Sequence, residues 1–180
     1  MTEKLPPIYN FPPLYTCQPN VLIREQQLST WCDLILDFAK TNNAWCMSQE
    51  GTVIKDSESS GQSIFRNESI QRSISVPFRD QIWNKMVQSE KAIKSNNGVF
   101  FILWRSVDYW SSQILQWFET TGKVNQVVTV YELLEGDETL GWEFHGMHPS
   151  LCEESLQKLR DRGRATLLKE QNKIMGVKVV

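Results

Sequence analysis

The sequence has few of the residues on which catalysis and metal binding most often depend. Its 180 residues include two His and four Cys, and no two Cys form a Cys-x-x-Cys pair. Glycine occurs nine times, without a Gly-rich phosphate loop, a nucleophile elbow or a His-Glu-x-x-His pattern. We therefore expect a protein that is not an enzyme and carries no cofactor.

Long apolar runs and an excess of one charge are also missing. Lys and Arg number 19 and Asp and Glu 21, so no global basic field attracts nucleic acid or anionic lipid. The longest apolar run, Val99 to Trp104, is far too short to span a bilayer. The irregularly spaced Cys fit reduced thiols better than a disulfide framework, and the first twenty residues are Pro-rich and polar rather than a secretory signal. These features predict a cytoplasmic protein.

One cluster deserves testing as a metal site. His145, His148 and Cys152 are close in sequence, and Glu143 or Glu153 could complete a set of four ligands. A pair of His in a loop beside a helix start is more often structural. We expect no metal.

The chain does contain a repeated phrase, Pro-Pro-aliphatic-Tyr, at residues 6–9 and again at 12–15. Each Pro fixes φ and removes an amide donor, which favours an extended polyproline-type ribbon over helix or sheet. Such ribbons usually bind a groove on another protein. The expected partner-binding residues are Pro6, Pro7, Tyr9, Phe11, Pro12, Pro13, Leu14 and Tyr15.

Two alternatives remain open for this segment. It could lie on its own domain and fill a surface groove there. It could also present ligands for the WW domains of a ubiquitin ligase, although Phe11 and Leu14 make it more apolar than a freely solvated WW ligand needs to be.

Hydrophobic periodicity divides the rest of the chain into two halves of similar element order. The first half predicts a helix capped by Asn20 and ending at Asn42-Asn43, a strand over 44–47 and a second helix begun by Pro77. It also predicts an exposed Ser-rich loop over 48–63, a short helix beginning at Asn67, and a hairpin of residues 92–94 and 99–104 around Asn96-Asn97-Gly98.

The second half predicts a helix over 108–121 ended by Gly122, and a short strand at Val127-Val128. It continues with a capping box formed by Thr129 and Glu132, a helix over 149–162, and a hairpin of residues 165–168 and 174–180. The predicted fold class is α+β. It consists of an extended docking segment (1–19) and two tandem winged-helix domains, 20–105 and 106–180.

Winged helices often read DNA, so charge must be considered. The candidate recognition helices, 77–90 and 149–162, carry nearly balanced charges. Arg160, Arg162, Arg164, Lys169 and Lys173 form a modest basic edge, of a kind that is usually a solvated face. Because phosphate contacts supply most non-specific affinity, DNA binding is the alternative and no nucleic-acid partner is expected.

Several stretches resemble one family, the small subunits of the endosomal ESCRT-II complex. They are Phe-Pro-Pro-Leu-Tyr-Thr (11–16), Gln-Pro-Asn (18–20), Ser-Thr-Trp (29–31), Phe-Ile-Leu-Trp (101–104), Ile-Leu-Gln-Trp-Phe-Glu (114–119), Tyr-Glu-Leu (131–133), Gly-Asp-Glu-Thr (136–139) and Trp-Glu-Phe-His (142–145). The resemblance covers nearly the whole chain and weakens at residues 48–66 and 88–98.

The resemblance implies a non-catalytic adaptor of two winged helices. Two copies would join one copy each of the larger subunits, vacuolar protein sorting-associated proteins 22 and 36. The Pro-Pro-x-Tyr motifs would dock each copy, and residues 106–180 would recruit an ESCRT-III subunit at the endosomal membrane. The implied function is sorting of ubiquitinated cargo into multivesicular bodies.

Overall fold

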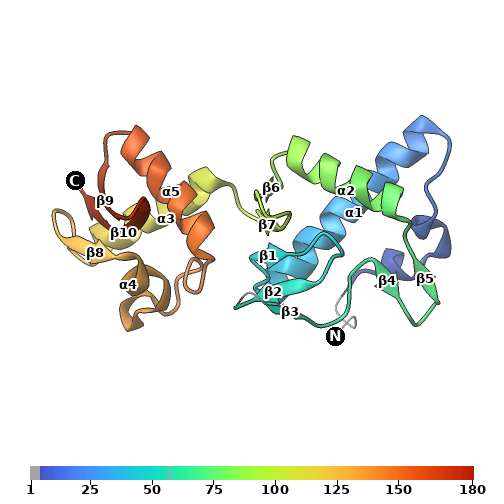
Figure 1. Ribbon diagram of the computed structural model, residues 1–180, viewed down its shortest axis with the longest axis horizontal. Helices are drawn as coiled ribbons and strands as arrows, with labels where there is room; N and C mark the ends of the chain where they lie inside the picture. Colours follow the sequence, from blue (N-terminus) through green and yellow to red (C-terminus); the bar gives the residue numbers. More distant parts are fainter. Residues whose placement is uncertain (1–4, 57) are drawn as a thin grey trace. The chain divides into compact units, whose positions relative to one another are not determined.

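The chain folds into helices and small antiparallel sheets, which confirms the α+β class. The computed structural model describes residues 5–56 and 58–180. These residues form two compact units, unit 1 and unit 2, which divide between Trp104 and Arg105 (Figure 1).

Unit 1 opens with two short 3-10 helices, η2 (Pro7–Asn10) and η3 (Pro12–Tyr15), followed by the long helix α1 (Val21–Asn42). The Asn20 side chain accepts hydrogen bonds from the amides of Leu22 and Ile23, as an N-cap does. Asn43 ends the helix in the left-handed conformation, at φ 49°. The predicted start and end of this helix are confirmed.

The larger sheet of unit 1 has five strands in the order β3-β2-β1-β7-β6. The hairpin predicted around Asn96-Asn97-Gly98 is confirmed as β6 and β7, whereas the strand predicted over 44–47 is reduced to two residues. The strand bounds are β1 (Cys46–Met47), β2 (Val53–Lys55), β3 (Glu58–Ser60), β6 (Ala92–Lys94) and β7 (Phe100–Ile102).

The Ser-rich loop predicted over 48–63 is wrong in part, because β2 and β3 form a hairpin there. Val53 pairs with both Met47 and Ser60, so the sheet extends outward from β1. The hydrophobic pattern did not predict β3 because its side chains are all exposed. An edge strand needs few apolar residues.

The short helix predicted at Asn67 is also wrong. A two-stranded hairpin occupies the region, with β4 (Arg66–Asn67) paired to β5 (Arg72–Ser73). The Asn67 side chain accepts from both the amide and the hydroxyl of Ser69, a local turn that competes with helix formation.

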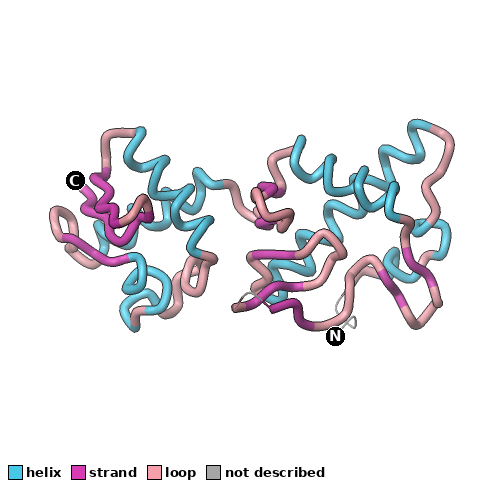
Figure 2. The backbone as a smooth tube through the Cα atoms, viewed as in Figure 1, coloured by secondary structure: helices cyan, strands magenta, loops and turns pink. Residues whose placement is uncertain are grey.

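The core of unit 1 lies between α1, helix α2 (Val76–Gln88) and the sheet. Trp31 of α1 and Ile82 of α2 are fully buried within it. The rings of Trp83 and Phe100 stack with centroids 4.2 Å apart, which joins α2 to β7. Figure 2 shows the two helices beside the strands of this unit.

Unit 2 has the element order helix, strand, helix, helix and two strands. A three-stranded sheet, β8-β10-β9, packs with its helices around a core that includes Trp110, Phe118, Leu156 and Val177. The elements are α3 (Val107–Thr120), β8 (Val127–Thr129), α4 (Val130–Glu135), η4 (Asp137–Thr139), α5 (Pro149–Asp161), β9 (Ala165–Glu170) and β10 (Lys173–Val179).

Side-chain caps fix the starts of α4 and α5. The predicted capping box is confirmed: the Thr129 amide donates to Glu132 Oε2 at 2.7 Å, and the Glu132 amide donates to Thr129 Oγ1 at 3.1 Å. The hydrogen bonds that the Thr129 amide and hydroxyl donate to the Glu132 carboxylate lower the pKa of this carboxyl. At α5, the Ser150 amide donates to His148 Nδ1 at 3.1 Å, and burial lowers the pKa of His148.

We predict that Thr129→Ala lowers the free energy of unfolding of unit 2 by about 1 kcal/mol, because an N-cap of this kind contributes about that much. Urea unfolding at pH 7 measures the loss. Thr166→Ala, an exposed change on β9, is the control and leaves the midpoint nearly unchanged. Equal stability of the two variants would contradict the prediction.

We also predict that unit 2 loses stability as the pH falls through about 6.5, the ordinary pKa of a histidine side chain. The folded pKa of His148 lies below its unfolded value, so in that window the unfolded chain binds the extra proton and acid favours unfolding. Protonation would also remove the Nδ1 acceptor that caps α5. His148→Asn keeps a capping oxygen and should flatten this dependence. Urea titrations of both proteins at pH 7.5 and 5.5 check it, and identical pH slopes would refute it.

Candidate docking surface

The Pro-rich segment folds as two tight turns rather than the predicted extended ribbon. The Tyr9 amide donates to the Pro6 carbonyl at 2.9 Å, and the Leu14 amide donates to the Phe11 carbonyl at 3.0 Å. Proline suits the start of such turns, since its fixed φ matches a 3-10 helix and no amide donor is needed there. The prediction of an extended conformation is therefore wrong.

Both turns direct their tyrosines into unit 1. Tyr9, Leu14 and Tyr15 are 2%, 4% and 3% exposed. The Tyr9 and Tyr15 rings meet Trp31 edge to face, at centroid distances of 6.3 and 5.2 Å, and meet each other at 6.0 Å. Tyr9, Leu14 and Tyr15 were expected as anchors for a partner but are buried in the chain's own core. This agrees with the alternative in which the segment lies on its own domain.

Hydrogen bonds to the backbone hold the same side chains in place. The Tyr15 hydroxyl donates to the Tyr9 carbonyl at 2.7 Å, and the Tyr9 hydroxyl donates to the Ile64 carbonyl at 2.8 Å. Trp31 Nε1 donates to the Leu14 carbonyl at 3.1 Å. Burial raises the pKa of both tyrosines, so their hydroxyls stay protonated and remain donors.

Two buried amides complete the attachment of the segment. Gln27 Nε2 donates to the carbonyls of Pro13 and Thr16, and its Oε1 accepts from the Gln18 amide. Asn67 Nδ2 donates to the Tyr9 carbonyl at 3.0 Å. Sequence reasoning missed both residues. The position of Gln27 one turn before Trp31, on the buried face of a helix, is a signal that could have revealed it.

The rest of the segment faces outward. Pro7, Ile8, Phe11, Pro12 and Pro13 are exposed, with Ile8 at 39% and Phe11 at 52%; Pro6 is half-buried. We call these five exposed residues the docking face. It is apolar and held on a rigid support, which is the character of a surface that binds another protein.

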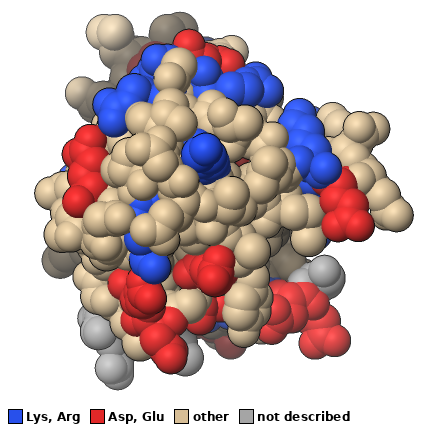
Figure 3. Space-filling model, turned by 90° about the vertical axis from the view of Figure 1, so that its left-hand side faces the viewer, with Lys and Arg blue, Asp and Glu red and all other residues tan. Residues whose placement is uncertain are grey.

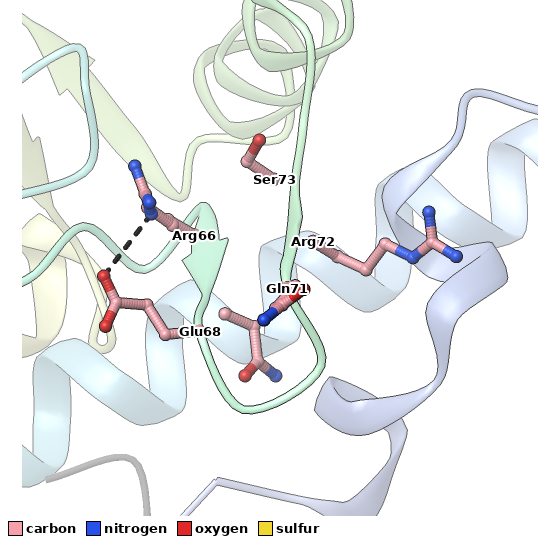
Figure 4. A pocket seen from close by; sticks show the side chains of 6 residues that line it. Arg66, Glu68, Gln71, Arg72 and Ser73 are labelled. Atoms are coloured by element: carbon pink, nitrogen blue, oxygen red, sulfur yellow. Dashed lines mark ion pairs between the residues drawn. The ribbon is translucent and has the colours of Figure 1, made fainter.

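An open hollow of about 560 Å³ lies along the β4–β5 hairpin, whose strand β5 contacts η3. Arg66 and Glu68, both in its lining, point toward each other, with Arg66 Nε 3.5 Å from Glu68 Oε1, whereas Arg72 extends away from that pair (Figure 4). The Arg66 carbonyl also accepts from the Tyr9 hydroxyl at 3.3 Å, so hairpin and segment form one surface region.

The buried tyrosines oppose the WW-ligand alternative. A WW domain binds an extended polyproline helix in an aromatic-lined groove. Here both turns are compact and both tyrosine rings are inaccessible, so the segment would first have to detach from unit 1.

Most of the basic edge in unit 2 is neutralised. Arg162 binds Asp108 at 2.8 Å, Arg160 binds Asp161 at 3.1 Å and Arg164 binds Glu119 at 3.3 Å. Figure 3 shows one face of unit 2, with basic side chains mainly in its upper part, acidic ones mainly in its lower part, and acidic groups beside several of the basic ones. DNA binding gains no support from this arrangement.

The residues considered as metal ligands have structural contacts instead. His145 Nδ1 lies 2.8 Å from the Thr139 hydroxyl, and His148 caps α5. Cys152 is fully buried, which raises the pKa of its thiol to about 12. Within residues 5–56 and 58–180, no three His, Cys, Asp or Glu side chains gather as a metal site would require. Among the same residues, no helix combines the length and apolarity needed to cross a bilayer.

Comparison with known proteins identifies relatives along the whole chain. A family model described as an ESCRT-II complex subunit matches residues 8–148. The chain is 50% identical to vacuolar protein-sorting-associated protein 25 of Saccharomyces cerevisiae, with 98% of each chain covered. Its counterpart in Xenopus laevis is 36% identical, with 94% of each covered.

Solved structures agree with the sequence relatives. The fold matches the VPS25 subunit of the endosomal trafficking complex ESCRT-II with a TM-score of 0.89 at 50% identity, covering 97% of this chain and 98% of that one. It also matches a chain in the endosomal complex ESCRT-II (VPS22/VPS25/VPS36) with a TM-score of 0.85 at 50% identity, over 97% and 98% of the two chains. The chain therefore belongs to the ESCRT-II complex subunit family.

Proposed function

We propose that this chain is a non-catalytic adaptor subunit of an ESCRT-II complex. Through the docking face, residues 1–19 attach it to the two larger subunits, vacuolar protein sorting-associated proteins 22 and 36, with two copies in each hetero-tetramer. Its two domains, 20–105 and 106–180, are of winged-helix type. Residues 106–180 recruit an ESCRT-III subunit, and the complex sorts ubiquitinated cargo into multivesicular bodies at the endosomal membrane.

The observation that carries the proposal is that some side chains of the Pro-rich segment are buried while others are exposed. Tyr9, Leu14 and Tyr15 face inward and fix the turns. Ile8 and the neighbouring Phe11 face outward, together with the three exposed prolines Pro7, Pro12 and Pro13. Partner binding then costs little conformational entropy, because the surface is already ordered before contact. A related chain in a solved complex with VPS22 and VPS36 supports the choice of partners.

The two copies of the motif contribute to one face rather than to two flexible ligands. Only six residues separate corresponding positions, and both turns are hydrogen-bonded to α1 or to the β4–β5 region. A larger subunit therefore meets a single contiguous surface on each copy of this chain. Contacts to both turns reinforce one another, since the second forms at high effective concentration.

We predict that substitutions of outward and inward residues of the Pro-rich segment have opposite effects. The double change Ile8→Ser and Phe11→Ser should abolish co-purification with the larger subunits while leaving the thermal midpoint nearly unchanged, because both side chains are exposed. Tyr15→Ala should lower the free energy of unfolding of unit 1 by roughly 3–5 kcal/mol, since it empties a large buried site.

Tagged pull-down from cells co-expressing all three subunits, together with thermal unfolding, measures both effects. Leu140→Ser, on an exposed residue of unit 2, is the matched control. Full complex formation by the folded double variant would refute docking through this face.

We also predict that a chain ending at residue 105 still enters the complex but no longer captures the ESCRT-III subunit. Unit 1 holds the docking face and forms a compact unit by itself, so its attachment should survive. Size-exclusion chromatography of the mixed proteins shows both interactions. Retention of the ESCRT-III subunit by the shortened chain would place the recruiting surface in unit 1.

A further inference from the structure

The first turn of α1 exposes three consecutive apolar side chains. Val21, Leu22 and Ile23 are 60%, 77% and 49% exposed. Consecutive exposed apolar residues are unfavourable in a solvated helix unless they serve a function. The first turn of α1 also has no acidic residue, although acidic groups there would favour the helix dipole.

Local folding does not explain these residues. Asn20 already supplies the cap that α1 needs, and Val and Ile are only moderate helix formers. Polar residues at the same positions would form the first turn at least as well. Their apolar character is therefore better explained by something that covers them.

This turn borders the docking face. Ile23 lies one turn before Gln27, so their side chains share one face of α1 about 5–6 Å apart at Cβ. Gln27 Nε2 holds the carbonyls of Pro13, at 3.1 Å, and Thr16, at 2.9 Å. Figure 1 shows the start of α1 at the same end of unit 1 as the two 3-10 turns.

We propose that the docking face continues onto Val21, Leu22 and Ile23, and that an apolar surface of the same larger ESCRT-II subunit covers both. This inference rests on the proposed function. Its basis is continuity: Gln27, one turn after Ile23, binds the Pro13 carbonyl, so a surface that packs on Pro13 lies close to the first turn of α1.

Charge favours a protein occupant over a lipid surface. Residues 16–31 contain one Arg and one Glu, and that Glu25 binds Lys85 of α2 at 3.1 Å. A membrane-binding turn would be expected to flank its apolar residues with several unpaired basic ones. The patch instead suits an uncharged, apolar face of a helix or loop.

The test compares the double change Leu22→Ser and Ile23→Ser with Leu140→Ser, a change of similar exposure in unit 2. Each full-length chain is titrated by calorimetry into the purified pair of larger subunits, and thermal unfolding of the free chain checks its fold. We expect at least tenfold weaker binding for the α1 variant, an unchanged thermal midpoint, and no effect of Leu140→Ser. If the double variant unfolds, the same binding measurement is made on Leu22→Asn alone, at the most exposed of the three positions.

The outcomes separate this inference from the proposed function. Normal binding by the α1 variant, together with loss of binding by the Ile8→Ser and Phe11→Ser variant, overturns the extension and leaves docking through the Pro-rich turns standing. Failure of the unaltered chain to bind overturns both. A variant that binds the larger subunits normally but shows weaker self-association in light scattering, or weaker flotation with anionic vesicles, assigns the turn to a second copy or to lipid and refutes the inference.

Discussion

The contact of the two motif tyrosines with Trp31 is the constraint on which the rest of unit 1 depends. It places the first turns of the chain against the middle of α1, and the tyrosine hydroxyls then reach the carbonyls of Tyr9 and Ile64. The segment, the long helix and the β4–β5 region are thereby joined in one core. The outward-facing prolines take their position from this contact, because both tyrosines lie in the same turns.

The same constraint gives the tyrosines of the Pro-Pro-x-Tyr motif a role different from the one usually inferred from sequence. A freely solvated motif presents its tyrosine to a partner, whereas here the tyrosine provides internal support and the neighbouring residues form the surface. The two prolines suit both arrangements, because their fixed φ is compatible with a polyproline ribbon and with a 3-10 turn. The choice between them is made by tertiary contacts.

Sequence reasoning succeeded where a local chemical signal determines the structure. The Asn20 cap, the Thr129–Glu132 capping box and the Asn-Gly hairpin each rest on groups only a few residues apart. It failed at β3, an exposed edge strand paired with neighbouring β2, and at β4–β5, a hairpin whose strands have no apolar side chains. It also failed at the Pro-rich turns, whose conformation depends on partners far away in sequence. Asn67, for example, contacts Tyr9 across 58 positions. The candidate site was predicted for the segment as a whole, and its inward and outward residues could not be separated without the core.

The long sequence separation of these contacts has a consequence for how the complex assembles. The first turns of the chain are synthesised early, yet their hydrogen-bond partners at Ile64 and Asn67 emerge from the ribosome more than fifty residues later. The exposed face therefore takes shape only after most of unit 1 has been made and folded. A subunit that recognises this face binds finished chains in preference to nascent or misfolded ones, and its binding in turn stabilises the folded state by mass action. On the proposed function, attachment through this face therefore selects chains that have folded correctly.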